Sequence, residues 1–408
     1  HPLARGQTVI KYSFPIGAAT APIAAGAWVH THNLKTCLEG VLEYSYEPAR
    51  AVGAQHAAPL HAPTFMGYRR PSGRVGTRNE VWILNTVACV NHAAERIAHE
   101  GSTLFHGRID GVYHFSHPYG CSQLGDDLGH TQRALAGLLR HPNAGGVLVL
   151  GLGCESNQMD ALLRLAGPPV DRERVRFFNS QDVTDEVDAG LEALGQLVAA
   201  MAGLTEVPEM FGAERALMSR AVDQTVFQAT VALINDFKAY FLRHGQPIYE
   251  NPSPGNIAGG LTTLEEKSLG AVQKGGQAAV TQVLRYGEPA ATRAGGLALL
   301  ESPGNDGVSS TALVASGATV LLFTTGRGTP LGFPVPTLKI SSNSAIAEKK
   351  PHWIDLNAGA LLDGATTMDQ LADELFTLIL DVASGRKLAN NEKHGYREIA
   401  IWKDGVTL

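Results

Sequence analysis

The order of apolar and polar residues divides the chain into a short β-rich beginning and two longer regions in which strands and helices alternate. Short apolar runs rich in β-branched residues predict buried strands, and an apolar residue every three or four positions predicts a helix. On these patterns we predict strands at residues 8–14, 27–34, 81–90, 145–154, 296–302 and 318–325. Helices are predicted at residues 92–101, 129–141 and 368–385, with a mostly helical region at 181–245.

Strands that alternate with helices are typical of mostly parallel sheets with crossover helices. We therefore expect an α/β protein with two Rossmann-like α/β domains, at residues 67–235 and 236–408. Residues 1–45 are too few to fold alone and are predicted to be a partial small β domain. The Pro- and Ala-rich residues 46–66 are predicted to be a linker. In such a fold, functional residues are expected at the carboxyl ends of the parallel strands.

Composition and charge narrow the classes of function. A chain of 408 residues is too long for one ordinary core. Its net charge of −6 argues against nucleic acid or an anionic membrane as a general partner. No apolar run reaches the length of a membrane span and no signal peptide is visible, so a cytoplasmic protein is expected. We find no Walker or dinucleotide fingerprint, which disfavours nucleotide binding.

The stretch with the most turn residues and reactive groups together is residues 250–276. Its prolines and glycines are predicted to break regular structure, and Thr262 is predicted to cap a helix with Glu265 at the capping-box position. Glu265, Glu266 and Lys267 then lie in the first turn, whose unpaired amides favour a carboxylate ligand. The simpler alternative is a capped helix after a tight turn, with Glu266 and Lys267 as a surface pair.

Two other loops are candidates for binding an anion. Arg74, Arg78 and Asn79 lie in a Gly-rich basic loop that could wrap an anion or could be a solvated turn. Thr324, Thr325 and Arg327 follow a predicted buried strand, where a ligand-facing role is expected.

Two groups of residues could hold a metal. His30 and His32 share one face if residues 27–34 form a strand, and would supply half a metal site; the alternative is two exposed histidines. Cys89, Cys121 and Cys154 follow or separate predicted strands and could hold iron or an iron–sulfur cluster with one open position. The alternative is that they are small buried packing residues, because cysteine is commonly buried. His117, four residues before Cys121, could join either arrangement.

Several long stretches resemble the altronate dehydratase/galactarate dehydratase family of sugar-acid dehydratases. They are GYRRPSGRVGTRNEV, HPYGCSQ, GLGCESNQ, ENPSPGNIAGGLTTLEEKSLGA, FTTGRGTPLG and WIDLNAG, from Gly67 onward. The opening GQTVIKYSFPIGAATAPIAAGAWVHTHNL resembles the end of the β-clip (SAF) domain that precedes the catalytic region in that family. Two family features are missing from the sequence. They are the first half of the β-clip domain and a CGGSDG-like segment expected near residues 202–206.

The resemblance implies loss of water from a hexonate or hexarate to give a 2-keto-3-deoxy acid. It implies Lys267 as base or carboxylate ligand and Glu266 as acid or metal-facing partner. The expected substrate-binding residues are Arg74, Arg78, Asn79, Asn256, Thr262, Thr263, Thr324, Thr325 and Arg327. The candidate metal ligands are His30, His32, Cys121 and Cys154.

The expected cofactor is a divalent metal, Fe²⁺ before Mn²⁺, with an iron–sulfur cluster as a further alternative. The expected partner is a small sugar acid, and the chain is expected to form a homo-oligomer, most simply a dimer. Two other functions stay open: a sulfolactate sulfo-lyase-like C–S lyase, and a sugar-acid-binding protein without turnover.

Overall fold

The computed structural model describes residues 1–11, 13–38, 40–46, 65–70, 72–106, 109–167, 174–185, 187, 210–249, 251–276, 278–291 and 296–405. Almost all of the predicted linker lies outside these residues, as does the expected position of the CGGSDG-like segment. Among the described helices, none is both long and apolar enough to cross a membrane.

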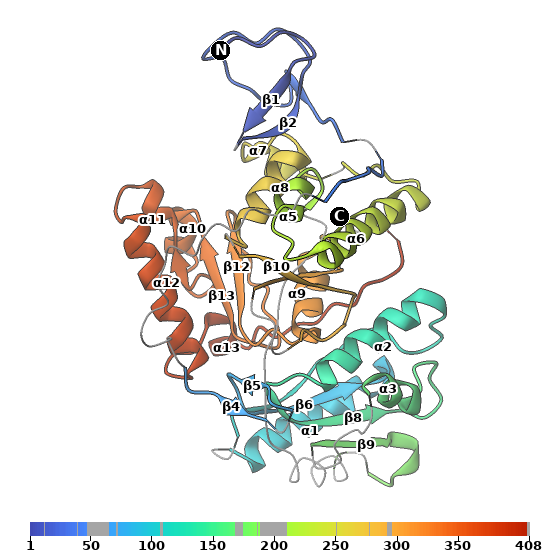
Figure 1. The fold of residues 1–408 in the computed structure, drawn as a ribbon. Coiled ribbons are helices and arrows are strands. Elements are labelled where there is room, and N and C mark those ends of the chain that lie inside the picture. Colours follow the sequence, from blue (N-terminus) through green and yellow to red (C-terminus); the bar gives the residue numbers. More distant parts are fainter. Residues whose placement is uncertain are drawn as a thin grey trace.

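The chain begins with a small antiparallel sheet. We call this sheet, together with the described residues that follow it up to residue 46, the N-terminal β segment. Its strands are β1 (Thr8–Lys11), β2 (Phe14–Ala19) and β3 (Leu34–Lys35), in the order β1-β2-β3. Its buried apolar side chains form one cluster with Leu269 of α8 (Leu264–Gln273). The segment therefore lies directly against α7 (Pro254–Ala258) and α8, at the top of Figure 1.

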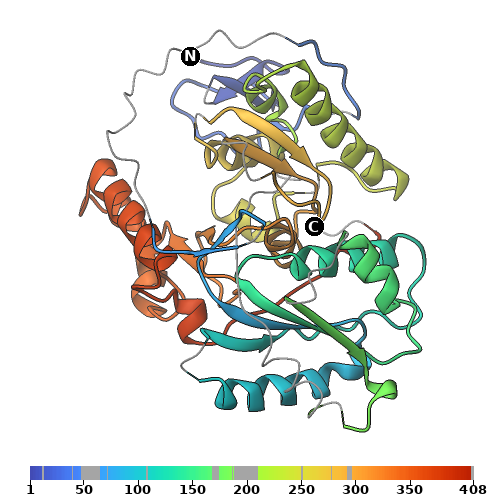
Figure 2. The same cartoon turned by 60° about the horizontal axis from the view of Figure 1, so that its bottom comes forward.

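A four-stranded parallel sheet occupies the other end of the molecule. It consists of β6 (Glu80–Asn85), β7 (Gly111–His114), β8 (Ala144–Gly151) and β9 (Val175–Asn179), in the order β7-β6-β8-β9. Helix α1 (Asn91–Leu104) lies on one face, and α2 (Gly125–Leu139) and α3 (Met159–Leu165) on the other (Figure 2).

Successive residues of β6 serve the two faces of this sheet. Val81 and Ile83 belong to the same buried cluster as Ile97 of α1, whereas Trp82 and Leu84 cluster with Leu135 of α2. A strand buried on both faces is apolar at every position. This explains why β6 and β8 are recognisable from their sequences alone.

The remaining elements form short parallel sheets with helices around them. Strands β10 (Val280–Leu284) and β11 (Leu297–Leu300) pair in one sheet, and β12 (Leu321–Thr325), β13 (Thr337–Ser341) and β14 (Leu356–Asn357) in another. The helices are α5 (Glu214–Met218), α6 (Gln224–Arg243), α9 (Asp306–Ala315), α10 (Ser344–Lys349), α11 (Gly359–Leu362), α12 (Met368–Ala383) and α13 (Asn390–Lys393). A hairpin of β4 (Tyr68–Arg69) and β5 (Val75–Gly76) precedes β6.

The mixed α/β class with mostly parallel sheets and a small N-terminal β segment is therefore confirmed. The second α/β region divides its strands between two sheets within the described residues, and its description as Rossmann-like stays a prediction.

The predicted strand at residues 27–34 is wrong. In this part of the chain only Leu34 and Lys35 form a strand, and Lys35 lies just beyond the predicted range. The Asn33 side chain instead closes a turn, donating from Nδ2 to the Trp28 carbonyl at 2.9 Å. Its Oδ1 accepts from the His30 amide, also at 2.9 Å.

Buried ion pairs join β6 to the C-terminal region. Arg78 donates to both carboxylate oxygens of Glu392 in α13, at 2.6 and 2.8 Å. Arg397 pairs with Glu80, the first residue of β6, at 2.9 Å and approaches Glu392 at 3.8 Å. The side chains of these four residues are at most 8% exposed. They form a polar connection through an otherwise apolar contact.

Candidate active site at the start of helix α8

Helix α8 begins one residue later than predicted. Thr263 is the N-cap, and its hydroxyl accepts from the Glu266 amide at 3.4 Å. Glu266, and not Glu265, therefore occupies the third helical position. The prediction that Pro254 breaks regular structure is also wrong, because Pro254 is the first residue of α7. Proline is well tolerated there, since the first helical amide needs no partner within the helix.

The N-terminal β segment holds both glutamates of the first turn. Glu265 accepts from the Thr36 hydroxyl at 2.9 Å and from the Cys37 amide at 2.8 Å. Glu266 pairs with Lys11 and also accepts from the amide of Thr262 at 2.9 Å and from its hydroxyl. Both carboxylates thus bind protein groups.

Sequence reasoning missed Lys11 and Thr36. Lys11 lies 255 residues from its partner Glu266, and Thr36 lies 229 residues from Glu265. No local pattern in the sequence marks such contacts, although the β-clip resemblance around these residues was a signal that the segment contributes to the site.

The charge state of Glu266 follows from these partners. Burial alone would raise the pKa of its carboxyl group, but hydrogen bonds from Lys11 and Thr262 and the charge of Lys11 together outweigh burial. The net pKa lies below its usual value, so Glu266 is ionised at neutral pH. Glu266 is expected to act either as an acid or as a metal-facing partner. An ionised carboxylate fits the metal-facing role better than the role of proton donor.

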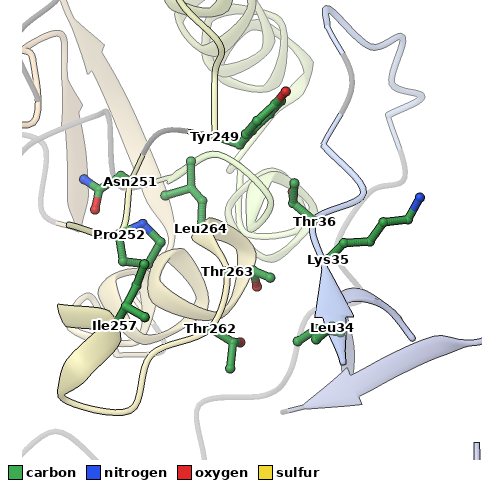
Figure 3. Close-up of a pocket in the computed structure, with 10 residues that line it drawn as sticks. All are labelled: Leu34, Lys35, Thr36, Tyr249, Asn251, Pro252, Ile257, Thr262, Thr263 and Leu264. Carbon is green, nitrogen blue, oxygen red and sulfur yellow. The ribbon is translucent and has the colours of Figure 1, made fainter. Parts of the chain in front are cut away.

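A hollow of about 140 Å³ lies between β3 and the start of α8. Asn251, Ile257, Thr262 and Thr263 line it on one side and Thr36 on the other, while Lys35 directs its ammonium group away from α8 (Figure 3). The Thr262 hydroxyl donates to Glu266 and the Thr263 hydroxyl to the Ile16 carbonyl, so both offer a ligand only their acceptor capacity.

Lys267 is half-buried and contacts one of the residues that line this hollow. Its ammonium group donates to Oδ1 of Asn251 at 2.9 Å, and Asn251 lines the hollow. The lysine is therefore held toward the loop that precedes α7.

The loop after β12 reaches the same region. A terminal guanidinium nitrogen of Arg327 donates to the Gly255 carbonyl in α7 at 3.0 Å. Thr325 accepts from the Gly328 amide at 2.9 Å, whereas Thr324 is exposed. Asn256, also in α7, donates to the Ser253 hydroxyl at 3.0 Å. The structure thus places two of the predicted loops, residues 250–276 and 323–332, side by side.

The third predicted loop lies elsewhere, beside β6 at the opposite end of Figure 1. Arg78 is 4% exposed and bound to Glu392, as described above. Asn79 accepts from Arg70 at 3.1 Å, and burial lowers the pKa of Arg74. These contacts give Arg78 and Asn79 protein partners far from α8, so we do not include this loop in the proposed site.

The candidate metal ligands lie in two separate places. His30 and His32 both follow Trp28 in sequence and pack on its ring, with centroid distances of 4.7 and 5.8 Å. Cys89, Cys121 and Cys154 are exposed, so the alternative that they are buried packing residues is wrong. Within the described residues, no three His, Cys, Asp or Glu side chains stand close enough together to hold a single metal ion.

These features define a class of protein: a mixed α/β enzyme whose candidate site combines the start of a helix with a small β segment from the other end of the chain. The chain belongs to the D-galactarate/altronate dehydratase family. Three sequence families match it: the SAF domain of altronate/galactarate dehydratase at residues 1–37, the second domain of D-galactarate dehydratase/altronate hydrolase at 67–202, and the C-terminal region of D-galactarate/altronate dehydratase at 192–407. The resemblance predicted from the motifs is confirmed.

Among known proteins, the chain is 46% identical to altronate dehydratase of Escherichia coli (strain K12), over 100% of this chain and 90% of that protein. It is 45% identical to altronate dehydratase of Bacillus subtilis (strain 168), over 98% and 89% of the two chains. It is 30% identical to galactarate dehydratase (L-threo-forming) of Escherichia coli (strain K12), over 97% and 86%.

Proposed function

We propose that the protein is a hydro-lyase that dehydrates a six-carbon sugar acid, with altronate as first candidate and galactarate as second. The observation that carries this proposal is the 46% identity to an altronate dehydratase over the whole of this chain. It is supported by the hydrogen bond of Lys267 to Asn251, which lines the hollow at the start of α8.

The hollow suits one end of such a substrate. Ligand pockets commonly measure roughly 300–1,000 Å³, so a hollow of about 140 Å³ takes only part of a six-carbon acid. We place the rest of the substrate along α7, toward Arg327, whose guanidinium group already lies against Gly255. A planar guanidinium group can bind a carboxylate in two hydrogen bonds.

Lys267 is the group that we assign to proton transfer. As the free amine it takes the proton from the carbon beside the carboxylate, and the electron pair of that C–H bond forms the C=C bond of an enol as the C3–O bond breaks. The resulting ammonium group returns the proton to the departing hydroxyl, which leaves as water, and the enol rearranges to the 2-keto acid. Asn251 holds Lys267 in place, and ionised Glu266 fixes Lys11 and Thr262 beside it.

A divalent cation, Fe²⁺ before Mn²⁺, is the cofactor that we propose, because it would stabilise the negative charge that develops on the substrate carboxylate. Around α8, the carboxylates of Glu265 and Glu266 bind protein groups, and the imidazoles of His30 and His32 pack on Trp28. They do not fit a complete single-ion site, and we derive no step through the ion.

The experiment is a panel of sugar acids assayed for 2-keto-3-deoxy acid formation, with Fe²⁺, with Mn²⁺ and after chelation. We expect turnover of altronate or galactarate, and loss of turnover after chelation. Sulfite release from sulfolactate would instead support the C–S lyase alternative, and binding without turnover would support the binding-protein alternative.

A matched pair of variants tests the assigned base. Lys267→Met should lower kcat by roughly 10² or more, which is the usual contribution of an acid–base group. Lys274→Met, at the far end of the same helix, is the control and should keep near-normal turnover. Near-normal kcat in Lys267→Met would remove Lys267 from the mechanism while leaving the family assignment intact. A homo-oligomer, most simply a dimer, stays a prediction that light scattering can test.

A further inference from the structure

Three exposed cysteines follow three neighbouring strands of the four-stranded sheet. Cys89 comes after β6, Cys121 after β7 and Cys154 after β8, and all three are free thiols. In the sheet order β7-β6-β8-β9, β7 lies on one side of β6, and β8, which follows β7 in the sequence, lies on the other side. The carboxyl end of β6 is therefore the point where the strand order reverses, which is where ligands bind in open parallel sheets.

Backbone hydrogen bonds join the loops that carry these cysteines. The Ala88 amide, beside Cys89, donates to the Tyr119 carbonyl at 2.9 Å, two residues before Cys121. The Asn157 amide, in the loop of Cys154, donates to the Gly120 carbonyl at 3.1 Å.

Glycine is required where these loops meet. Gly120 has a φ of 101°, and a Cβ atom there would lie 2.1 Å from the Thr86 carbonyl oxygen. The three cysteine loops thus pack on one another through their backbones and meet at one end of the sheet.

Two buried asparagines at the same strand ends have unused acceptors. Asn85, the last residue of β6, and Asn157 are both fully buried, and in the described part of the chain neither Oδ1 atom has a hydrogen-bond partner. Their amide nitrogens are used, toward Asn91 and the Thr86 carbonyl. A buried acceptor without a donor costs free energy, so each of these oxygens is expected to accept from a water molecule that fills the space beside the strand ends.

From this arrangement we infer that the carboxyl edge of the four-stranded sheet binds an iron–sulfur cluster through Cys89, Cys121 and Cys154. The cluster site lies apart from α8, and Figure 1 shows this helix and the four-stranded sheet at opposite ends of the molecule. Three thiolate ligands would leave one iron of a four-iron cluster without a protein ligand.

The kind of donor suits an iron–sulfur cluster. Among the described side chains, no three His, Cys, Asp or Glu groups stand close enough together to hold one ion. In a cluster each thiolate binds a different iron, so the sulfur atoms need not share one coordination sphere. Thiolates are the usual protein ligands of such clusters.

The test measures cluster content without any substrate, so its outcome is independent of the proposed dehydration. The full chain is reconstituted anaerobically with ferrous iron and sulfide and then desalted. We expect about four irons and about four acid-labile sulfides per chain, with visible absorbance that bleaches on reduction. Iron bound without sulfide, or no retained iron, would overturn the inference.

Serine variants identify the ligands. Cys89→Ser, Cys121→Ser and Cys154→Ser should each lose most of the bound iron and sulfide, whereas Cys37→Ser, which changes the exposed cysteine of the N-terminal β segment, should retain them. Equal contents in all four variants would refute the assignment. Far-UV circular dichroism checks that each variant is folded, and the electron paramagnetic resonance spectrum of the reduced wild-type protein reports the cluster without any variant.

Discussion

Glu392→Met should destabilise the protein strongly, because it leaves a buried guanidinium group without its carboxylate. Arg78 is 4% exposed and gives two short hydrogen bonds, of 2.6 and 2.8 Å, to Glu392. Removing one partner of such a buried pair typically costs about 3–5 kcal/mol, mostly through the charge that stays behind. Glu392 also accepts from the Ala389 amide at 2.9 Å, so the variant loses a helix cap as well.

The double variant distinguishes the free-energy cost of an unpaired buried charge from the cost of the lost contact. Arg78→Met together with Glu392→Met removes both charges and leaves two apolar side chains of similar length. We expect it to be more stable than Glu392→Met alone, by about 1–3 kcal/mol, because neighbouring substitutions are coupled by this amount. Arg397 keeps its pairing with Glu80 in both variants.

The assay is urea-induced unfolding followed by circular dichroism and tryptophan fluorescence, with coincidence of the two transitions as the check that one free energy describes them. Asp381→Asn is the matched control. It breaks the ion pair with Arg386, whose side chains are 34% and 56% exposed, and should change stability by less than about 1 kcal/mol. A loss below about 1 kcal/mol in Glu392→Met, or a double variant no more stable than Glu392→Met alone, would refute the reasoning.

Two further predictions concern the site itself. Arg327→Lys should raise KM for the sugar acid roughly tenfold. The reason is that an ammonium group cannot bind both the Gly255 carbonyl and a carboxylate with the geometry of a planar guanidinium group. Unchanged steady-state kinetics would place Arg327 outside the site. The lowered pKa of Glu266 should contribute stability that is fully present above the unfolded-state pKa, roughly 4.3, and is lost as pH falls through the lower folded-state pKa. Melting temperatures measured from roughly pH 6 to pH 3 should therefore fall less steeply in Lys11→Met than in wild type, and identical slopes would contradict this account.

The sequence predicts best those elements whose burial is complete. The interiors of β6 and β8 are apolar because helices cover both faces of their sheet. The predicted starts agree with the structure to within one residue, whereas the predicted ends lie five and three residues too late. Helix α12 is found equally well, since its apolar residues recur at helical spacing and Thr367 forms a capping box with Gln370.

The wrong predictions concern stretches in which hydrogen bonds from side chains determine the backbone conformation. Residues 27–34 alternate like a strand, but the Asn33 side chain bonds the backbone at both ends of a turn, and strand propensity cannot register this competition. Thr262 and Thr263 are equally good N-caps from the sequence. The choice between them depends on the Ile16 carbonyl and on Glu266, which reaches back to the Thr262 amide.

The attachment of the N-terminal β segment to α8 also orders events during synthesis. Lys11 leaves the ribosome 255 residues before Glu266. At roughly 5–20 residues per second, this delay is on the order of 10–50 s. Throughout this time the segment lacks the helix against which its apolar side chains pack, and it is too small to fold alone. This segment is made long before α8 and is therefore among the last parts of the described chain to reach its final structure, and a cell must keep its short strands from pairing elsewhere until α8 has been synthesised.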